Sequence, residues 1–319
     1  MLECALQKLT DYPAGEGLAR SSFVASAQAR FLMSRFISSL DCKDSTKELY
    51  AKAARYFLEW MDEKLITTPT VETLIRFKSW LRSKDLSPNT VNSYLVGIKR
   101  LFMFFEKSGY YPNIAKDIKG FKQASGHLRD AFSKHEIRDI LNAIDTSTQR
   151  GKRDYAIINL MARTGLRTIE VASANYGDLR INGEEGILYI KGKGREAKDE
   201  FVLLTKESLT PLLEYLEDRG QVPVQAALFV SLSNRNKESR LTTRAVRGII
   251  CNHKEKIESN NRRLSAHSLR HFFATCSLQS GAPVLQVKDA LRHKSVETTQ
   301  RYLHNLERIE NGAERFIEI

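Results

Sequence analysis

The stretch DLRINGEEGILYIKGKGREAKDEFVLL, residues 178–204, is where the spacing of the apolar residues changes from that of a helix to that of a strand. Three short apolar runs, DLRI, ILYI and EFVLL, are separated by segments rich in Gly, Asn and Lys. Such runs between turn residues predict strands joined by turns. The flanking segments have helical periodicity, so the sequence predicts a mainly α fold with a small antiparallel β-meander.

The segments before this stretch have the pattern of amphipathic helices. In LSPNTVNSYLVGIKRLFMFFEKSG, residues 86–109, apolar residues recur at three- and four-residue spacing. Ser87 is placed to cap this helix with Pro88 at its first position, and Gly109 ends it. A bundle of four or five short helices is predicted, because similar stripes run through 27–40, 45–61 and 71–83.

The chain is expected to fold as two domains joined by a linker. Periodicity is lost over residues 110–130, and a new helix begins at a capping box formed by Ser133 and Glu136. We expect a lead-in at 1–21, a helical domain at 22–117, a linker at 118–129 and a second domain at 130–319. Helices in the second domain are predicted near 152–163, 207–219, 242–258, 267–280 and 284–292.

Charge and cysteine usage limit the class of protein. The 319-residue chain has a formal net charge of +12, and both halves are basic, as expected of a protein that meets a polyanion. The four cysteines show no paired spacing, which predicts reduced thiols. No apolar run has the length of a membrane span, and the N-terminus lacks the order of a signal peptide. These features favour a cytoplasmic protein that binds nucleic acid and has no membrane partner.

Two motifs in the second half carry side chains suited to a phosphate. ARTGLRTIEVA, residues 162–172, places Arg167 at a junction between two helices, beside free backbone N–H groups. SAHSLRHFFAT, residues 265–275, places His267 and Arg270 on one helical face. Taken singly, the first motif is also compatible with an arginine in a surface ion pair, and the second with a solvated basic helix.

A third motif, LRHKSVETTQRYLH, residues 291–304, contains His293 and Tyr302. A tyrosine in such a place is usually half-buried with its hydroxyl bonded and unreactive. His267 and His271 also suggest metal ligation, but no third ligand stands at a recognisable spacing, so no metal or cofactor is expected. The order Arg, Lys-containing hairpin, His-x-x-Arg, His and Tyr is much more specific than any one motif.

This ordered set resembles the catalytic domain of the tyrosine recombinases, the phage-integrase family, and looks most similar to its compact Xer-like members. The resemblance covers roughly residues 25–310. It implies a two-domain DNA clamp, in which the helical bundle is the core-binding domain and the second domain is a mixed α/β catalytic domain. It also implies a supporting role for Glu170 and catalytic roles for Arg167, Lys193, His267, Arg270, His293 and Tyr302.

The sequence departs from the family pattern at several positions. Arg292 stands where the family usually has a glycine before the second histidine, and Ser268 replaces a common acidic residue. The hairpin GKGREAKDEF lacks the usual arginine and is longer, so Lys191 and Lys198 remain alternatives to Lys193.

The chemistry explains why these residue types are needed. Two arginines neutralise the non-bridging oxygens of a phosphodiester, the tyrosine attacks phosphorus, and the family's hairpin lysine protonates the leaving 5′-oxygen. A 3′-phosphotyrosine keeps the energy of the phosphodiester, so rejoining needs no ATP, and the chain has no GxxxxGK[ST] loop. We expect a metal- and ATP-independent site-specific recombinase that acts on double-stranded DNA.

Two alternative functions remain at this stage, a type IB topoisomerase and a catalytically silent architectural DNA-binding protein. Within the recombinases, chromosome-dimer resolution, transposon resolution and integration share the same catalytic residues.

Partner contacts are expected on two helices and at the C-terminal segment. The candidates for DNA contact are Asn89, Thr90, Asn92, Lys99 and Arg100 in the first domain and Thr243, Arg244 and Arg247 in the second. The resemblance implies a homotetramer on two paired sites, with each C-terminal segment passed to a neighbouring subunit. Phe316 and Ile317 are the predicted anchors, and packing of the segment against its own domain is the alternative.

Overall fold

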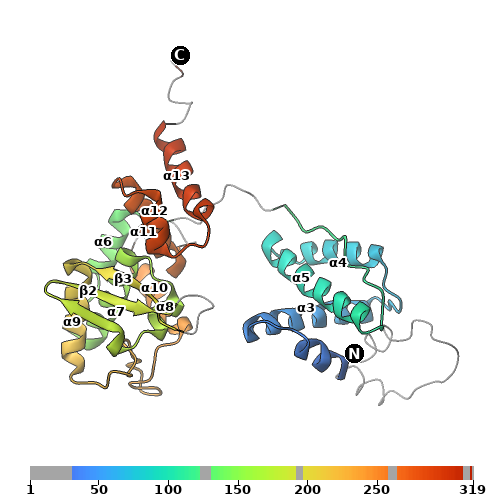
Figure 1. Cartoon of the computed structure of the whole chain (residues 1–319), viewed down its shortest axis with the longest axis horizontal. Coiled ribbons are helices and arrows are strands. Elements are labelled where there is room, and N and C mark those ends of the chain that lie inside the picture. The colour runs from blue at the N-terminus through green and yellow to red at the C-terminus, as the bar shows by residue number, and fades with distance from the viewer. Residues whose placement is uncertain (1–30, 123–130, 192–196, 258–263, 312–316, 318–319) are drawn as a thin grey trace. The chain divides into compact units, whose positions relative to one another are not determined.

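Residues 31–122, 131–191, 197–257, 264–311 and 317 are described by the computed structural model shown in Figure 1, without the side chains of 305–311. The chain divides into two units, Met1–Gly126 and His127–Ile319. Each unit encloses a hydrophobic cluster of its own. The division falls within the stretch that the sequence marks as a linker.

The first unit is helical throughout its described residues. A helix over 31–38 is followed by α3 (Asp44–Glu63), α4 (Val71–Ser83) and α5 (Pro88–Lys107). The predicted cap of α5 is confirmed, because the Ser87 side chain accepts from the backbone N of Thr90 and Pro88 opens the helix. Aromatic side chains fill the cluster between these helices, among them Phe57, Phe77 and Phe102.

The end of the first unit differs from the sequence prediction. Ile118 is buried, and the side chain of Asn92 on α5 donates to the carbonyl of Phe121 at 2.9 Å and accepts from its backbone N at 2.7 Å. The residues up to Phe121 therefore pack on the bundle, so the predicted linker, 118–129, begins too early. The Asn92 amide, predicted to contact DNA, is engaged with the Phe121 backbone inside the unit.

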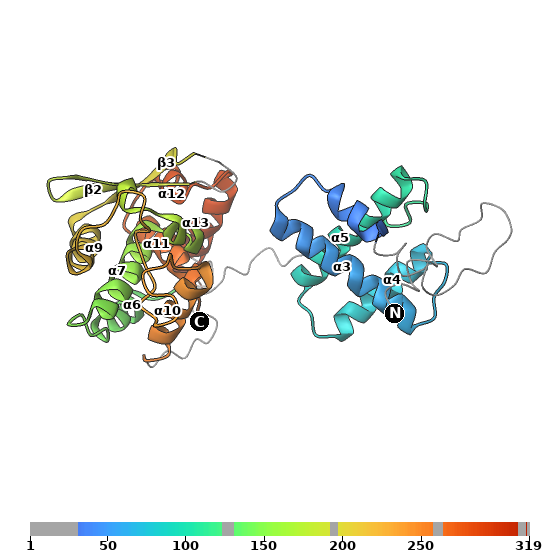
Figure 2. The ribbon, with the colours of Figure 1, turned by 90° about the horizontal axis from the view of Figure 1, so that it is seen from below.

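In the second unit the helices lie on one side of a small sheet (Figure 2). It begins with α6 (Lys134–Asn142), whose predicted capping box of Ser133 and Glu136 is confirmed. The elements that follow are α7 (Gln149–Thr164), α8 (Thr168–Ser173), the short 3₁₀ helix η1 (Tyr176–Asp178), β1 (Leu179–Asn182), β2 (Glu185–Ile190), β3 (Glu200–Leu204), α9 (Lys206–Arg219), α10 (Thr243–Lys254), α11 (Ala266–Gln279), α12 (Val284–Leu291) and α13 (Val296–Asn311).

The three strands form the predicted meander, with strand order β1-β2-β3 and antiparallel pairing throughout. Asn182 pairs with Glu185, so the first turn is tight, and Gly183 adopts a φ of +63° that favours glycine. Along β3, Val202 and Leu204 are buried while Phe201 and Leu203 are exposed, as the two-residue period of a strand requires.

Helix α7 lies in the core of the second unit, where it contacts α9 and α11. Its interior positions, such as Ile157, Leu160 and Met161, are fully buried. At its C-terminus Gly165 takes the left-handed conformation, with φ +63°. A Cβ at Gly165 would lie 2.8 Å from Leu291 Cδ2 and from Phe273 Cδ1, so glycine lets α11 and α12 approach this end of α7 closely.

Candidate active site

Arg167 lies at the N-terminus of α8, just after the turn that ends α7. Its backbone N donates to Glu170 Oε2 at 2.8 Å and its Nη1 donates to Glu170 Oε1 at 2.7 Å. The Arg167 side chain is 27% exposed, whereas that of Glu170 is 1% exposed. The buried carboxylate therefore orients an arginine that remains accessible to a phosphate.

Glu170 is ionised in spite of its burial. Burial alone would raise the pKa of this carboxyl, but the charge of Arg292 and the hydrogen bonds from Arg167 outweigh it and hold the pKa below its usual value. Arg292 Nη2 donates to Glu170 Oε2 at 2.7 Å. One carboxylate is thus shared by two guanidinium groups.

Arg270, on α11, donates hydrogen bonds to the two chain segments that precede Arg167 and His293. Its Nη1 donates to the carbonyl of Gly165 at 2.7 Å, and its Nη2 donates to the carbonyl of Leu291. Those carbonyls lie two residues before Arg167 and two before His293. Each terminal nitrogen carries a second N–H, which leaves donors for a substrate oxygen. Burial, followed by the charges of Arg167 and Arg292, lowers the Arg270 pKa to about 9, so the group stays charged at neutral pH.

His293 follows the C-terminus of α12 and is half-buried. Its Nδ1 lies 2.9 Å from the hydroxyl of Thr299, a fully buried residue near the start of α13. Burial and the positive charges of Arg270 and Arg167 lower the His293 pKa to about 4. The imidazole is therefore neutral at physiological pH, and its position beside both arginines is the one that the sequence order predicts.

Tyr302 lies on α13 and is 5% exposed. Its ring packs in a small cluster with Ala274, Leu278 and Leu291, and its hydroxyl is hydrogen-bonded to Nδ1 of His271. Burial raises the Tyr302 pKa, and the charge of Arg270 offsets part of this effect. The hydroxyl is therefore buried, protonated at neutral pH and engaged with His271.

His267 and Arg270 lie on the same helix but in different surroundings. His267 is exposed, whereas Arg270 is 2% exposed, and the His267 ring packs edge-on against that of His271 with centroids 4.6 Å apart. The charge of His267 contributes to the lowered pKa of His293. No group of three or more His, Cys, Asp or Glu residues that could hold a metal ion occurs in the described part of the chain.

The lysine of the hairpin is only partly tested by the structure. Lys193 lies outside the described residues. Lys198 is ion-paired with Asp178, and its Nζ is 3.4 Å from the carbonyl of Ser173, which fits a structural role better than that of a proton donor. Lys191 is exposed at the end of β2.

The predicted DNA-contact side chains divide into two groups. Arg244 and Arg247 are exposed on α10, three residues apart, opposite its buried positions, and Thr243 opens the same helix half-buried. On α5, Asn89 and Arg100 are exposed. Thr90 instead contacts the capping hydroxyl of Ser87 at 2.9 Å, and Lys99 Nζ lies 3.4 Å from the carbonyl of Lys116.

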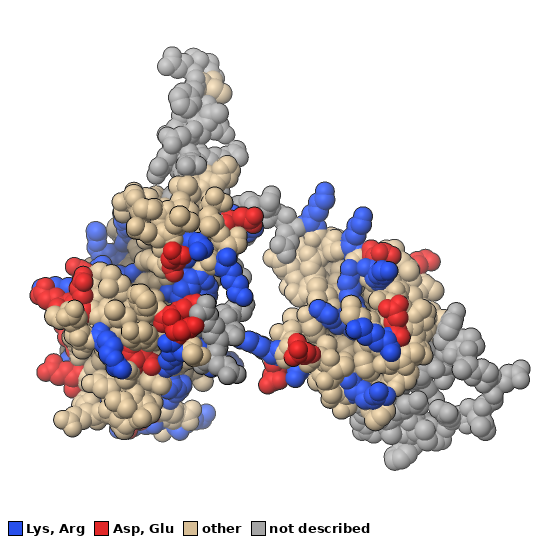
Figure 3. All heavy atoms as spheres, viewed as in Figure 1, with Lys and Arg blue, Asp and Glu red and all other residues tan. Residues whose placement is uncertain are grey.

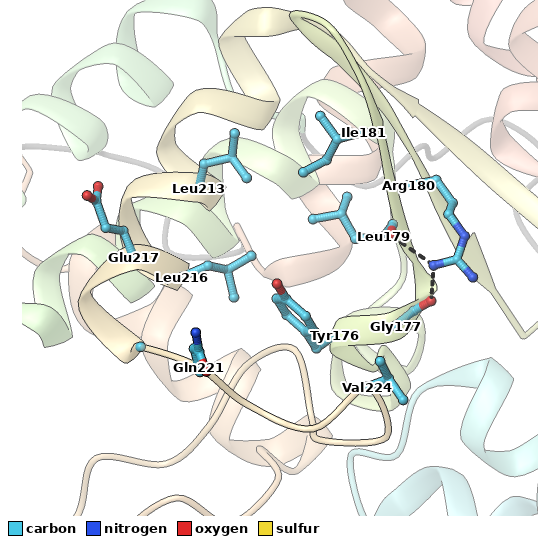
Figure 4. Close-up of a pocket in the computed structure, with 11 residues that line it drawn as sticks. Tyr176, Gly177, Leu179, Arg180, Ile181, Leu213, Leu216, Glu217, Gln221 and Val224 are labelled. Atoms are coloured by element: carbon cyan, nitrogen blue, oxygen red, sulfur yellow. Dashed lines mark hydrogen bonds between the residues drawn. The ribbon is translucent and has the colours of Figure 1, made fainter.

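Basic and acidic side chains share the visible surface of the protein. Figure 3 shows Lys and Arg over the visible face of both units, with Asp and Glu interspersed on each and present also at the left edge of the second unit, on the side of α9 and β2. A cavity of about 530 Å³ on this side lies between β1 and α9, lined by Tyr176, Leu179 and Leu213 among others (Figure 4). None of the predicted catalytic residues lines it.

Three residues at the site have contacts that the sequence did not reveal. His271 bonds Tyr302, Thr299 bonds His293, and Arg292 bonds Glu170. His271 was recognisable as a neighbour of His267 one helical turn away, and Arg292 as a departure from the family pattern. Nothing in the local sequence distinguished Thr299 from a surface threonine.

Comparison with known proteins agrees with this geometry. Residues 130–308 match the family model described as the phage integrase family. Tyrosine recombinase XerD of Listeria monocytogenes serovar 1/2a is 31% identical over 270 residues, covering 82% of this chain and 88% of the relative. Tyrosine recombinase XerC of Leptospira interrogans serovar copenhageni is 30% identical over 283 residues, covering 73% of this chain and 88% of the relative.

Solved structures show the same fold. A post-cleavage complex of the XerH site-specific recombinase with palindromic difH substrate has a TM-score of 0.72 at 22% identity, covering 97% of this chain and 95% of that one. A lambda integrase (75–356) dimer bound to a COC′ core site has a TM-score of 0.64 at 14% identity. The match covers 86% of this chain and 94% of that one. With the family match and the relatives above, the chain belongs to the phage integrase family and is an Xer-like tyrosine recombinase.

Proposed function

We propose that Tyr302 is the nucleophile with which this site-specific recombinase breaks and rejoins DNA strands. The observation that carries the proposal is the convergence of four separate elements on one site. The N-terminus of α8 supplies Arg167, α11 supplies Arg270, the end of α12 supplies His293, and α13 supplies Tyr302.

The proposed reaction is an in-line exchange of phosphate esters. Tyr302 Oη attacks phosphorus and loses its proton, the bond from phosphorus to the 5′-oxygen breaks, and the leaving oxygen takes a proton from Lys193. Arg167 and Arg270 bind the non-bridging oxygens and stabilise the charge that develops on them. The reverse attack by a 5′-hydroxyl restores the phosphodiester and the tyrosine, so no energy source is consumed.

The hydrogen bond from Tyr302 to His271 suggests how attack is restrained before DNA is bound. The hydroxyl is buried, its pKa is raised, and it has a partner in the same unit. When DNA binds, Arg167 and Arg270 would hold the scissile phosphate, and this phosphate would compete with His271 for the Tyr302 hydroxyl. His271 Nδ1 is then a nearby group that can accept the hydroxyl proton.

The test uses a covalent complex as its readout. Sites of protein–DNA adducts are first mapped on genomic DNA of the host, and a nicked suicide duplex is built on the mapped sequence. Wild type should give an SDS-resistant adduct, while Tyr302→Phe should bind the duplex with similar affinity and give none. Phenylalanine keeps the ring packing in the cluster with Leu291, so the comparison isolates the hydroxyl. An adduct formed by the phenylalanine variant would show that another residue attacks.

We also propose that the active form is a homotetramer on two paired DNA sites, acting in the cytoplasm. Within the described residues, no helix is long and apolar enough to cross a membrane. Each subunit of the tetramer would pass the segment after α13 to a neighbour. The acidic and apolar sequence ERFIEI, residues 314–319, suits a groove that has an apolar floor and a basic rim.

Such a groove lies between α6 and α11. Its volume is about 710 Å³, Ile137, Leu141 and Phe272 are among its apolar lining residues, and Lys134 and Arg138 are exposed at its α6 side. We propose that this α6–α11 groove receives Phe316 and Ile317 of the neighbour, with Glu318 near Arg138.

A charge exchange tests this contact. Deletion of residues 312–319 and the single change Arg138→Glu should each leave single-site binding intact and weaken the pairing of two duplexes in a gel-shift assay. Combining Arg138→Glu with Glu318→Arg should restore pairing, because the attraction is rebuilt with reversed signs. Wild-type pairing by the truncated chain would refute exchange, and loss of the folded monomer would favour packing of the segment in cis.

A further inference from the structure

Arg292 is held in a backbone conformation that an arginine rarely adopts. It closes α12 with φ 55° and ψ 45°, in the left-handed region. Three other non-glycine residues in the described part of the chain have positive φ: Leu65, Asp85 and Glu238, all exposed. The Arg292 side chain is 6% exposed. A strained backbone with a buried, charged side chain requires strong compensating contacts.

Those contacts join three elements around the site. Nη2 donates to Glu170 Oε2 on α8 at 2.7 Å, and Nη1 donates to the carbonyl of Ala290 on α12 at 2.5 Å. Nε lies 3.8 Å from Glu200 Oε2, at the start of β3, and has no hydrogen-bond partner among the described residues. Glu200 directly follows the hairpin that carries Lys193 in the sequence.

The main consequence concerns the charge of Arg167. If Glu170 had Arg167 as its sole partner, the two would form a neutral pair and the carboxylate would cancel the charge that a phosphate must meet. Arg292 is bonded to the same carboxylate and also lies 3.8 Å from Glu200, so its charge is balanced by the two carboxylates while the charge of Arg167 stays available beside that of Arg270. Negative charge develops on the phosphate oxygens in the transition state, where this available positive charge stabilises it.

We infer that Arg292 is a positioning residue, which binds Glu170 and so orients Arg167 and leaves its positive charge available to the scissile phosphate. The inference rests on the proposed function of Tyr302 and the two arginines. Arg292 acts through the carboxylate of Glu170, to which its Nη2 donates.

The variants follow from the geometry. Arg292→Gly is compatible with the left-handed backbone, so it removes the guanidinium without adding strain. Arg292→Lys keeps the charge but loses the planar fork. Arg219→Gln is the control for the loss of an arginine that only binds backbone, because Arg219 donates to the carbonyls of Ala227 and Leu228 from the C-terminal end of α9.

Single-turnover cleavage of the suicide duplex and its binding constant are measured for each variant. Arg292→Gly should slow cleavage about tenfold to a hundredfold, the loss expected for one charge-assisted hydrogen bond, with affinity changed less than about threefold. The cleavage rate of Arg292→Lys should lie between those of Arg292→Gly and wild type, and Arg219→Gln should cleave at the wild-type rate. A cleavage rate of Arg292→Gly within about threefold of the wild-type rate would overturn the inference.

A double variant separates charge from simple support. If Arg292 acts by neutralising Glu170, Arg292→Gly combined with Glu170→Gln should cleave faster than Arg292→Gly alone, because no carboxylate then cancels the charge of Arg167. If the double variant instead loses cleavage rate by the product of the two single-variant losses, Arg292 has a purely structural role and the inference is overturned.

A DNA-free readout is the titration of His293 by NMR. Arg292 is one of the charges that lower the pKa of this histidine, so Arg292→Gly should raise that pKa, and an unchanged value would contradict the electrostatic argument. Failure of the proposed function has a different signature, since wild type itself would then form no Tyr302 adduct.

Discussion

Replacing Gly165 by alanine perturbs the point at which three parts of the active site meet. Gly165 ends α7, its carbonyl accepts from Arg270 Nη1 at 2.7 Å, and Arg167 follows two residues later. Its φ is +63°, and a Cβ there would lie 2.8 Å from Leu291 Cδ2 and Phe273 Cδ1. The change therefore strains both the backbone and the packing.

The two costs can be separated in magnitude. A side chain in the left-handed conformation costs about 1–2 kcal/mol, which loss of unfolded-state entropy offsets by about 0.4–1 kcal/mol. Overpacking against Leu291 and Phe273 adds about 1–3 kcal/mol. Gly183→Ala is the matched control, because Gly183 has the same φ of +63° but nothing within 4 Å of its Cβ position. The difference between the two variants isolates the packing cost.

The assay combines urea denaturation with single-turnover cleavage. We expect Gly165→Ala to lower the free energy of unfolding by about 1–3 kcal/mol more than Gly183→Ala does. Displacement of Leu291 also moves the carbonyl that binds Arg270 and the residues leading to His293. Because misplacement by about 1 Å can cost about a hundredfold in rate, cleavage by folded Gly165→Ala should fall well below that of Gly183→Ala.

Two results would refute this reasoning. Equal losses of stability in the two glycine variants would mean that the neighbours of Gly165 give way freely. Wild-type cleavage by Gly165→Ala, at a temperature where it is fully folded, would mean that the position of this turn does not set the two arginines.

Three further predictions concern single residues. Asn92→Ala should destabilise the first unit by about 1–3 kcal/mol in urea denaturation, through its lost bonds to the Phe121 backbone, while DNA affinity measured by gel shift changes little. The pKa of His293 is about 4 in the fold and about 6.5 unfolded, so its contribution to stability is complete above pH 6.5 and lost towards pH 4; His293→Gln should flatten that part of the pH dependence, and a parallel curve would contradict it. Lys193→Ala should abolish cleavage of normal DNA. A 5′-bridging phosphorothiolate substrate should restore cleavage, because a thiolate leaves without a proton. If the phosphorothiolate rescues Lys191→Ala or Lys198→Ala instead, that lysine is the proton donor.

The sequence by itself determined the local structure and the order of the chemistry. Helix starts were readable at Ser87 and Ser133, because a capping hydroxyl acts within three residues of its own position. The strands of 178–204 were readable from apolar alternation and turn residues, which are also local signals. The ordered motifs indicated the family, which the comparisons show, and predicted that Arg167, Arg270, His293 and Tyr302 form one site.

The tertiary structure decided which side chains meet across long separations. Helical periodicity places residues on a common face, but it does not say which other element covers that face. The bond of Asn92 to Phe121, 29 residues away, was therefore not readable from the stripe of α5. In the same way, packing of α13 on α11 places the Tyr302 hydroxyl at His271, and the left-handed end of α12 brings Arg292 to Glu170, 122 residues earlier in the chain. These pairings depend on how separate helices pack on one core, a property that no short stretch of the sequence contains.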